Sequence, residues 1–219
     1  FDGVVLACID FADPEVIELV QSSIPVVTID YLFNNRIAIM SDNVTGMKEL
    51  LEYIYSRGHR KIAYIHGADS AVTQSRLSTF YRMAEQKGLS IPDAYIKEAA
   101  YRNADEAYER TRELLALEDR PTCILYQDDF ASFGGIKAIR QAGLKIPQDI
   151  SVAGYDGIRI AYQLEPQLTT LKQDTDSIGR LAAEQLISLI EEPKTTLIRP
   201  YIVEGYVEKG QSVRDINHT

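Results

Sequence analysis

The fold is decided by a stretch in the second half of the chain, GLKIPQDISVAGYD at residues 143–156. Before it, residues 130–142 have the amphipathic spacing of a helix, and Gly143 is a typical helix stop. After it, Ile150–Gly154 is an apolar run without in-and-out alternation. Strands that are buried on both faces have this composition, which is typical of a parallel sheet covered by helices.

The same alternation of apolar runs and amphipathic stretches extends along the whole chain. The predicted strands are Val4–Cys8, Pro25–Ile29, Ile37–Met40, Ile62–His66, Cys123–Tyr126 and Ile150–Gly154. The predicted helices are Asp13–Ser22, Thr45–Arg57, Ser75–Lys87, Ala104–Leu117, Phe130–Ala142 and one that starts near Asp174. This β-α-β order implies right-handed crossovers and an α/β fold with doubly wound parallel sheets. The strands form two groups, before and after about residue 69, which suggests two similar lobes.

Composition excludes several classes of protein. The 219 residues include 23 Lys and Arg against 32 Asp and Glu, a net charge of −9. A chain this acidic is not expected to grip nucleic acid by itself, because such binding needs cationic side chains that meet phosphates. No apolar run approaches the roughly 18 residues of a membrane span. Two cysteines, Cys8 and Cys123, are too few for a disulfide scaffold.

Motifs for catalysis, metal binding and phosphate binding are missing from the sequence. The three histidines lack the spacing of a helical zinc site, and no nucleophile elbow or phosphate-binding glycine loop occurs. Gly134-Gly135 lies inside a predicted helix, where it favours close packing. Asp128-Asp129 follows a strand and leaves three roles open: acid/base or metal chemistry, contact with a polar ligand, or a helix cap. We therefore expect neither an enzyme nor a bound metal or cofactor.

Several motifs together resemble one family. The stretch SRGHRKIAYI at residues 56–65 is similar to the x-x-G-H-R-x-I-A-x-I signature of the LacI/GalR (lactose/galactose repressor) family. The block at residues 143–156 agrees best, and LTTLKQ at 168–173, IPVVTID at 24–30 and Ser75-Arg76-Leu77 agree in order and spacing. The resemblance extends to about residue 212.

The resemblance implies a periplasmic-binding-protein-like type I fold, with two lobes joined by three crossing strands and a ligand cleft between them. We expect the first lobe at residues 1–69, the second at 70–170, a hinge strand with returning helix and last strands at 171–210, and a tail at 211–219. Phe1 leads almost directly into a strand that resembles the third strand of the family. We therefore expect a piece of a longer protein, with an incomplete first lobe and no helix-turn-helix headpiece.

The resemblance also implies two main ligand contacts. Arg76 matches the family arginine that forks onto ligand oxygens, and the alternative is a surface arginine that opposes the dipole at a helix start. Asp156 follows a buried strand and is expected to accept hydrogen bonds from ligand hydroxyls. Its alternative role is to cap a helix that starts at Gly157.

Asp128 stands where relatives usually carry asparagine, just before the common aspartate, here Asp129. Because a carboxylate only accepts hydrogen bonds, Asp128 favours a ligand that is rich in hydroxyls, while Asp129 is expected to cap the next helix. Gln173 and Tyr101 match further cleft positions, Tyr101 as an aromatic that stacks on the ligand. Asp10 lies in the loop after the predicted strand Val4–Cys8 and is expected to contact the ligand from the first lobe. Two or three acids with one arginine favour a neutral sugar over a purine.

The family resemblance predicts the ligand-sensing and dimerisation domain of a cytoplasmic bacterial transcription regulator. It implies a homodimer formed by two helical segments, through Ala131, Phe133, Gly134, Ala138, Ile158 and Tyr162. Operator DNA is expected to be bound only through the absent headpiece, and no membrane contact is expected. The alternative is a periplasmic sugar-binding protein of a transport system, which would have the same fold.

Overall fold

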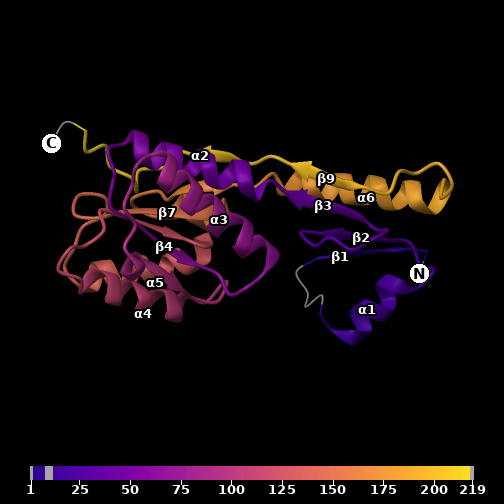
Figure 1. The fold of residues 1–219 in the computed structure, drawn as a ribbon, viewed down its shortest axis with the longest axis horizontal. Helices are drawn as coiled ribbons and strands as arrows, with labels where there is room; N and C mark the ends of the chain where they lie inside the picture. The colour runs from indigo at the N-terminus through magenta and orange to yellow at the C-terminus, as the bar shows by residue number, and fades with distance from the viewer. Residues whose placement is uncertain (1, 8–11, 218–219) are drawn as a thin grey trace. The chain divides into compact units, whose positions relative to one another are not determined.

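The computed structural model describes residues 2–7 and 12–217 and divides the chain into two α/β units (Figure 1). Unit 1 consists of residues 1–42 and 174–205, and unit 2 of residues 43–173 and 206–219. The chain passes between the units at residues 42–43, 173–174 and 205–206. Each unit is built around its own sheet, so the predicted α/β class with parallel sheets flanked by helices is confirmed.

Unit 1 contains a parallel sheet of four strands in the order β1-β2-β3-β9. The strands are β1 (Val4–Leu6), β2 (Val26–Ile29), β3 (Ile37–Ser41) and β9 (Pro200–Val203). Successive side chains of β2 point to opposite faces, because a strand has a period of two residues. Val26 packs towards α1 (Pro14–Gln21), whereas Val27 packs towards α6 (Thr175–Glu191). The predicted start of α1 is confirmed, since the Asp13 carboxylate accepts a hydrogen bond from the Glu15 N–H at 2.8 Å.

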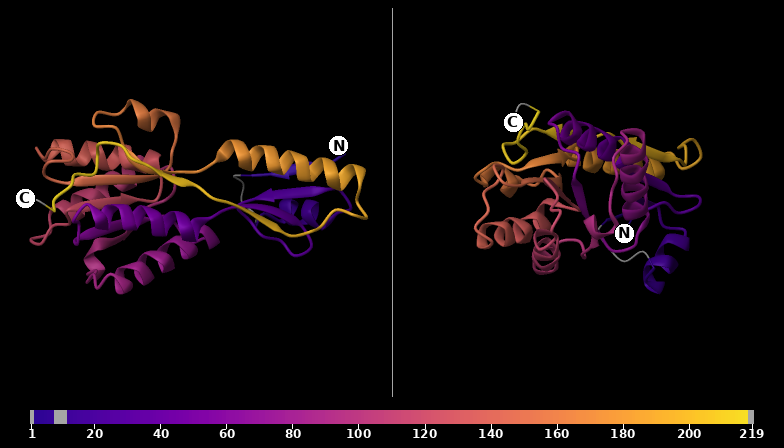
Figure 2. Two further views of the ribbon diagram at one scale, coloured as in Figure 1. Left: turned by 90° about the horizontal axis from the view of Figure 1, so that it is seen from above. Right: turned by 60° about the vertical axis from the view of Figure 1, so that its left-hand side comes forward.

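Unit 2 contains a sheet of six strands in the order β10-β8-β7-β6-β4-β5, of which only β10 is antiparallel among the described strands. The strands are β4 (Ile62–His66), β5 (Ile96–Glu98), β6 (Cys123–Tyr126), β7 (Ser151–Asp156), β8 (Thr169–Lys172) and β10 (Tyr206–Glu208). Helices α2 (Asn43–Ser56) and α3 (Ala71–Gln86) cover one face, and α4 (Ala104–Leu115) and α5 (Asp129–Gln141) cover the other (Figure 2). Strands sandwiched in this way are apolar on both sides, which explains the bare apolar runs of the sequence.

The division into units differs from the predicted one. The prediction that the first lobe extends to residue 69 is wrong, because β4 pairs with β5 and β6 inside the sheet of unit 2. Ile62 and Tyr64 pack under α2 and α3, while Ala63 and Ile65 face α4 and α5. The predicted segment at 171–210 is also divided, since α6 and β9 belong to unit 1 and β10 to unit 2. The tail is part of unit 2.

Most predicted elements are found within a few residues of their expected bounds. The largest shift is in α3, which begins at Ala71 because the Ser70 side chain caps it by accepting a hydrogen bond from the Thr73 N–H at 3.1 Å. The short strand β5 was not predicted. The short helix predicted at 158–162 is a 3-10 helix, η2 (Arg159–Gln163). The end of the strand predicted at Val4–Cys8 lies outside the described residues.

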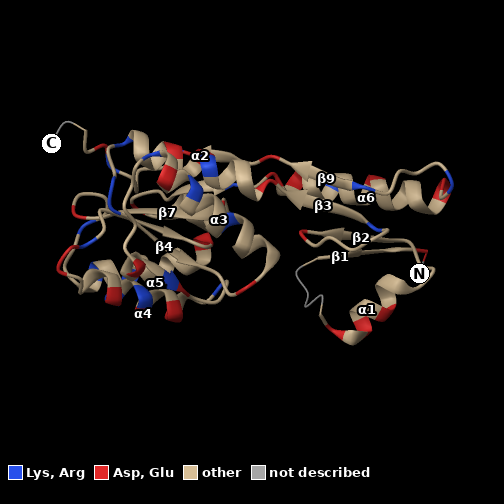
Figure 3. Ribbon diagram, viewed as in Figure 1, with Lys and Arg blue, Asp and Glu red and all other residues tan. Residues whose placement is uncertain are grey.

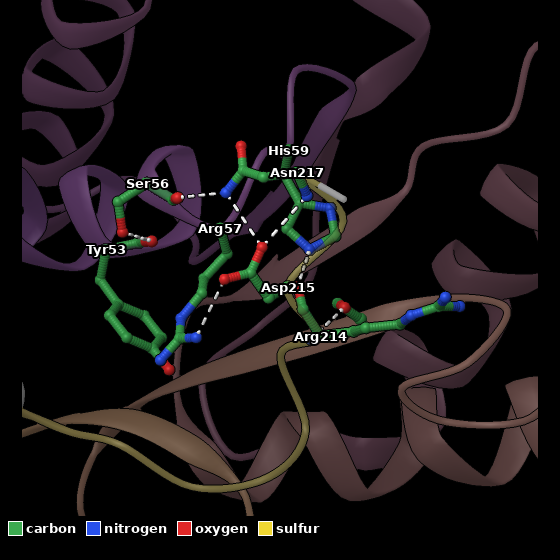
Figure 4. A network of polar contacts seen from close by, with 8 residues as sticks. Tyr53, Ser56, Arg57, His59, Arg214, Asp215 and Asn217 are labelled. Carbon is green, nitrogen blue, oxygen red and sulfur yellow. Dashed lines mark hydrogen bonds and ion pairs between the residues drawn. The ribbon is translucent and has the colours of Figure 1, made fainter. Parts of the chain in front are cut away.

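The tail of unit 2 is fastened to a buried histidine (Figure 4). His59 is 1% exposed and lies three residues after the end of α2. Its Nε2 lies 3.0 Å from the Arg214 carbonyl oxygen and its Nδ1 lies 2.9 Å from the Thr122 Oγ1. Because a carbonyl can only accept, Nε2 carries the proton and donates it to the tail. Gly58 before it has φ +91°, and a Cβ there would lie 2.9 Å from Ile216.

A second set of bonds ties the tail to the end of α2 (Figure 4). Arg57 forms an ion pair with Asp215 at 3.3 Å, and the Asn217 side-chain amide donates to the Ser56 carbonyl oxygen at 2.8 Å. The Ile216 N–H donates to the Arg57 carbonyl oxygen at 2.8 Å. Arg57, Gly58 and His59 therefore form a structural fastening for the tail.

Replacing this histidine tests the fastening. His59→Ala is expected to lower the free energy of unfolding at pH 7.5 by about 2 kcal/mol, because the imidazole is buried and its two half-buried partners, the Thr122 hydroxyl and the Arg214 carbonyl oxygen, lose a hydrogen bond. Burial lowers the pKa of His59, and its bond to Arg214 opposes this only in part. The His59 side chain of the unfolded chain therefore binds a proton more tightly than that of the folded chain. The stability advantage of the parent protein over His59→Ala is lost as the pH falls below about 6.5.

Urea denaturation at pH 7.5 and pH 5.5 measures this difference, with the exposed neighbour Arg60→Ala as the control. Equal unfolding midpoints for His59→Ala and the parent protein at pH 7.5 would contradict the fastening.

Charges of both signs are mixed on the surface helices (Figure 3). Along α4, Arg110 pairs with Glu113, and Arg112 pairs with Glu109 at 3.2 Å. Exposed pairs of this kind contribute little to stability. None of the helices in the described ranges combines the length and the apolar character that a membrane crossing needs.

Candidate functional site

Most of the predicted ligand residues gather at one edge of the unit 2 sheet. Because β4, β6, β7 and β8 are parallel, their carboxyl ends share this edge, the usual ligand site of open α/β sheets. Asp128 follows β6, Asp156 ends β7 and Gln173 follows β8. Arg76 comes from α3, and Tyr101 lies in the turn after β5. The structure thus brings together five of the six predicted residues, while Asp10 lies outside the described residues.

Arg76 is held rigidly from three sides. It is 4% exposed, so the surface alternative is wrong. Its Nε donates to the Asn43 Oδ1 at 2.8 Å, and its Nη1 donates to the Gln127 carbonyl oxygen at 3.0 Å. The guanidinium also lies over the Tyr155 ring, with Cζ 3.5 Å from the ring centroid. A planar guanidinium on an aromatic face gains a cation–π attraction in addition to its hydrogen bonds.

One end of this guanidinium forms no hydrogen bond within the described part of the chain. Burial opposes the charge of Arg76, but Tyr155, Tyr101 and Asp156 outweigh it and raise the pKa, so the group stays charged. Nη2 has no hydrogen-bond partner among the residues that the structure describes. A fixed cation with an unused pair of N–H donors is suited to bind oxygen atoms of a ligand.

Asp156 and Gln173 form a second polar group at the same edge. The Gln173 Nε2 donates to the Asp156 Oδ1 at 2.6 Å, and the Gln173 N–H donates to the Asp156 carbonyl oxygen at 3.1 Å. Asp156 does not cap a helix, because η2 begins three residues later and has no side-chain cap. Burial raises the pKa of Asp156 to about 6, although Arg76 and Gln173 favour its charged form. Its φ of 108° is rare outside glycine and marks a strained position.

The two neighbouring aspartates do not have the roles that were expected of them. Asp128 caps α5, since its Oδ1 accepts from the Ala131 N–H at 2.6 Å and its Oδ2 accepts from the Arg102 N–H at 2.8 Å. The prediction that Asp129 is the cap is wrong. Asp129 is fully buried and accepts hydrogen bonds from the Thr170 Oγ1 at 2.6 Å and the Ile158 N–H at 2.9 Å. Both oxygens of Asp128 are engaged, and its contact with a ligand stays a prediction.

Asp129 gives the stability of unit 2 a dependence on pH. Burial raises the pKa of Asp129 to about 7, and its two hydrogen bonds oppose this only in part. In the unfolded chain the pKa is about 3.9. The folded protein therefore holds the proton more tightly, and this contribution is full below about pH 4 and is lost as the pH rises through about 7.

Asp129→Asn is expected to remove this dependence, because the amide can accept from Ile158 and donate to Thr170 without a charge. Between pH 4 and pH 7 the free energy of unfolding of the parent protein should fall relative to the variant, by at most about 1.4 kcal/mol per pH unit. The charge of Asp156 raises the pKa of Asp129, so the difference between the two proteins reports Asp129 together with its interaction with Asp156. Parallel stability curves from guanidinium titrations would show that Asp129 is charged throughout.

Tyr101 lies beside Arg76 but is tied down at its hydroxyl. Its Oη lies 2.9 Å from the Thr73 Oγ1, and its ring packs on Gly67, where a Cβ would lie 2.1 Å from the ring. Only glycine leaves room for this ring. The ring is half-buried, and its stacking on a ligand stays a prediction.

Three residues of the site were missed in the sequence. Asn43 and Gln127 hold the guanidinium of Arg76, and Tyr155 lies beneath it. Tyr155 falls within the block at residues 143–156 that resembles the family, which was the only signal available for it. No sequence signal marked Gln127, because its contacts are with residues that follow another strand of the sheet.

The predicted dimer residues divide into two groups. Ala131 and Ala138 are 0% and 2% exposed, and a Cβ on Gly134 would lie 1.7 Å from the Ala104 carbonyl oxygen. These three residues pack α5 within the unit, so the prediction that they face a partner subunit is wrong. Phe133, Ile158 and Tyr162 are half-buried and stay a prediction. The exposed apolar residues of this region are Phe130 and Ile160, at 46% and 53%.

Comparisons with known proteins agree on one family. The model of the periplasmic binding protein-like domain matches residues 51–213. The probable HTH-type transcriptional repressor ExuR of Bacillus subtilis (strain 168) is 30% identical over 199 residues, covering 89% of this chain and 60% of that protein. The HTH-type transcriptional repressor PurR of Escherichia coli O1:K1 / APEC is 29% identical over 212 residues, covering 93% of this chain and 62% of that protein.

A solved structure leads to the same family. A regulatory protein of the LacI family from Chloroflexus aggregans has a TM-score of 0.84 at 28% identity, over 96% of this chain and 76% of that one. This chain spans about 60% of the length of the curated relatives, 60% for ExuR and 62% for PurR. The resemblance in the sequence is thereby confirmed: the chain is similar to LacI-family regulators, and it belongs to the family of periplasmic binding protein-like domains.

Proposed function

We propose that this chain is the ligand-sensing part of a transcription regulator and that it binds a small sugar at the carboxyl edge of the unit 2 sheet. The observation that carries the proposal is the fixed Arg76 guanidinium, whose Nη2 lacks a partner among the described residues. Asp156 and Gln173 supply further acceptors and donors at the same edge. The similar ExuR and PurR proteins are repressors, which favours a regulator over an enzyme or a transport protein.

A sugar fits this set of groups better than an apolar ligand. Each hydroxyl can accept a hydrogen bond from the Arg76 Nη2 and donate one to the carboxylate of Asp156. Since Asp128 is engaged as a helix cap, Asp156 is the main acidic contact, and a neutral sugar leaves it and Arg76 balanced. Tyr101 offers an aromatic face beside them.

A thermal-shift screen of the 219-residue chain tests this proposal. The panel contains a neutral pentose, a neutral hexose, a disaccharide, a sugar acid and a purine, each over a concentration series. A ligand that binds only the folded state raises the melting temperature with concentration. We expect a neutral sugar to give the largest shift. If only the purine or only the sugar acid raises the melting temperature, the proposal of a neutral sugar is wrong. If no compound of the panel changes the melting temperature, the result counts against the sensing role.

We also propose a homodimer in which Phe133, Ile158 and Tyr162 lie at the subunit interface, together with the exposed Phe130 and Ile160. The rings of Phe130 and Phe133 pack edge to face with centroids 5.7 Å apart, and contiguous exposed apolar area of this kind marks interaction sites. Operator DNA would be bound by a headpiece outside this chain, and sugar binding would change operator affinity by about 1–3 kcal/mol.

Sedimentation velocity tests the dimer with a matched pair of variants. Ile160 and Ile187 are both 53% exposed, but only Ile160 lies in the proposed interface. Ile160→Glu is expected to give a monomer and Ile187→Glu to leave the dimer unchanged. A monomeric parent protein, or equal dimerisation of both variants, would contradict the interface.

A further inference from the structure

Gln127 connects two parts of the candidate site that come from different elements. It is fully buried and directly follows β6. Its backbone carbonyl oxygen accepts from the Arg76 Nη1 at 3.0 Å. Its side-chain Nε2 donates to the carbonyl oxygens of Ala99 at 3.1 Å and Ala100 at 3.0 Å. Because β4 lies between β6 and β5, this side chain reaches across the carboxyl end of β4 to the turn after β5.

The orientation of the amide is determined by its partners. Both partners of Nε2 are carbonyl oxygens, which can only accept, so the NH2 group faces them and Oε1 faces the other way. Oε1 is buried and has no hydrogen-bond partner within the described part of the chain. A buried acceptor without a partner is unfavourable, and a side chain such as methionine would avoid it. Packing alone therefore does not account for an amide at this position.

The turn that Gln127 holds carries two residues of the site. Tyr101 is half-buried, and Arg102 has φ 57°, a left-handed conformation that is costly for a residue with a side chain. The Arg102 N–H donates to the Asp128 Oδ2 at 2.8 Å. The turn is thus bonded on one side by Gln127 and on the other by Asp128. Loss of the Gln127 amide would leave the carbonyl oxygens of Ala99 and Ala100 without these donors.

We infer that Gln127 is a positioning residue of the site, which fixes the Tyr101–Arg102 turn relative to Arg76 without touching the ligand. Its backbone holds the guanidinium, and its side chain holds the turn. The part of this inference that concerns ligand affinity rests on the proposed function, whereas the part that concerns the turn does not.

Hydrogen exchange without any sugar tests the turn. The chain is compared with Gln127→Met, which keeps the length of the side chain, and Gln127→Glu, which places an oxygen against both carbonyls. We expect amide exchange in residues 99–104 to be about tenfold faster in both variants at pH 8 and unchanged in residues 211–217. Equal exchange in residues 99–104 in a folded variant would overturn the inference.

Two further readouts separate positioning from general destabilisation. At pH 5 the carboxyl group introduced by Gln127→Glu can carry a proton and donate it to one carbonyl, so its exchange should return towards the parent value while that of Gln127→Met does not. For the sugar with the largest thermal shift, both variants should bind about tenfold more weakly at pH 8. If no sugar binds the parent protein, the proposed function fails, and the exchange result still decides the role of Gln127.

Discussion

Arg76→Ala should greatly weaken sugar binding and lower the free energy of unfolding by about 2–4 kcal/mol. The affinity loss corresponds to roughly 30- to 1000-fold, because a charge-assisted contact is removed from a buried site. The stability loss has a separate cause: the Asn43 Oδ1 and the Gln127 carbonyl oxygen lose their donor, and the Tyr155 ring loses its covering group. Calorimetric titration and urea denaturation measure the two effects independently.

Arg180→Ala is the matched control for this substitution. Arg180 belongs to an exposed ion pair with Glu184 on α6, at 65% and 53% side-chain exposure. Such pairs contribute little, so its removal should change stability by less than about 0.5 kcal/mol and leave sugar binding unchanged. Unaltered affinity in a folded Arg76→Ala protein would show that the sugar binds elsewhere.

Gly134→Ala is expected to destabilise unit 2 by about 3–5 kcal/mol. The added Cβ would lie 1.7 Å from the carbonyl oxygen of Ala104, a backbone atom that can move only if α4 moves. Gly179→Ala makes the same chemical change in the middle of α6, where nothing lies within 4 Å of the new atom. That control should be stabilised by up to about 1 kcal/mol, since alanine is the better helix former.

Thermal and chemical unfolding of the two glycine variants also test the dimer surface. If Gly134 faced a partner subunit, as the family resemblance implied, alanine there would weaken dimerisation and leave the unfolding of the monomer unchanged. A stable Gly134→Ala monomer would therefore contradict the packing of α5 on α4.

The strands that could be predicted from the sequence are those buried on both faces. Ile62–His66 and Cys123–Tyr126 have apolar side chains at nearly every position, which is why their bounds agree with the structure. β5 has one apolar residue, Ile96, followed by Lys97 and Glu98 at the edge of the sheet, so no pattern marked it. The predicted boundary between the two units was wrong for another reason, because an apolar run in the sequence does not show which sheet the strand will join.

The charged residues of the candidate site were predicted from the sequence, but the residues that hold them in place were missed. Arg76 and Asp156 stood out because the positions match a family motif, and the structure places both at one sheet edge. The cap of α5 depends on where the helix begins, and a shift of one residue made Asp128 the cap in place of Asp129. Asn43 and Gln127 act through Arg76, which approaches them from another helix, so their contacts do not follow from their own neighbours in the sequence.

The most direct test of the account is the hydrogen exchange of the whole chain with and without a saturating neutral sugar from the thermal-shift screen. The account predicts slower exchange in the presence of the sugar at three places in unit 2: around Arg76, in the turn at residues 99–104, and at residues 155–157. The tail at 211–217, which is fastened to His59, should exchange equally in both states. Protection confined to the tail, or to unit 1 alone, would contradict a sugar site at the carboxyl edge of the unit 2 sheet.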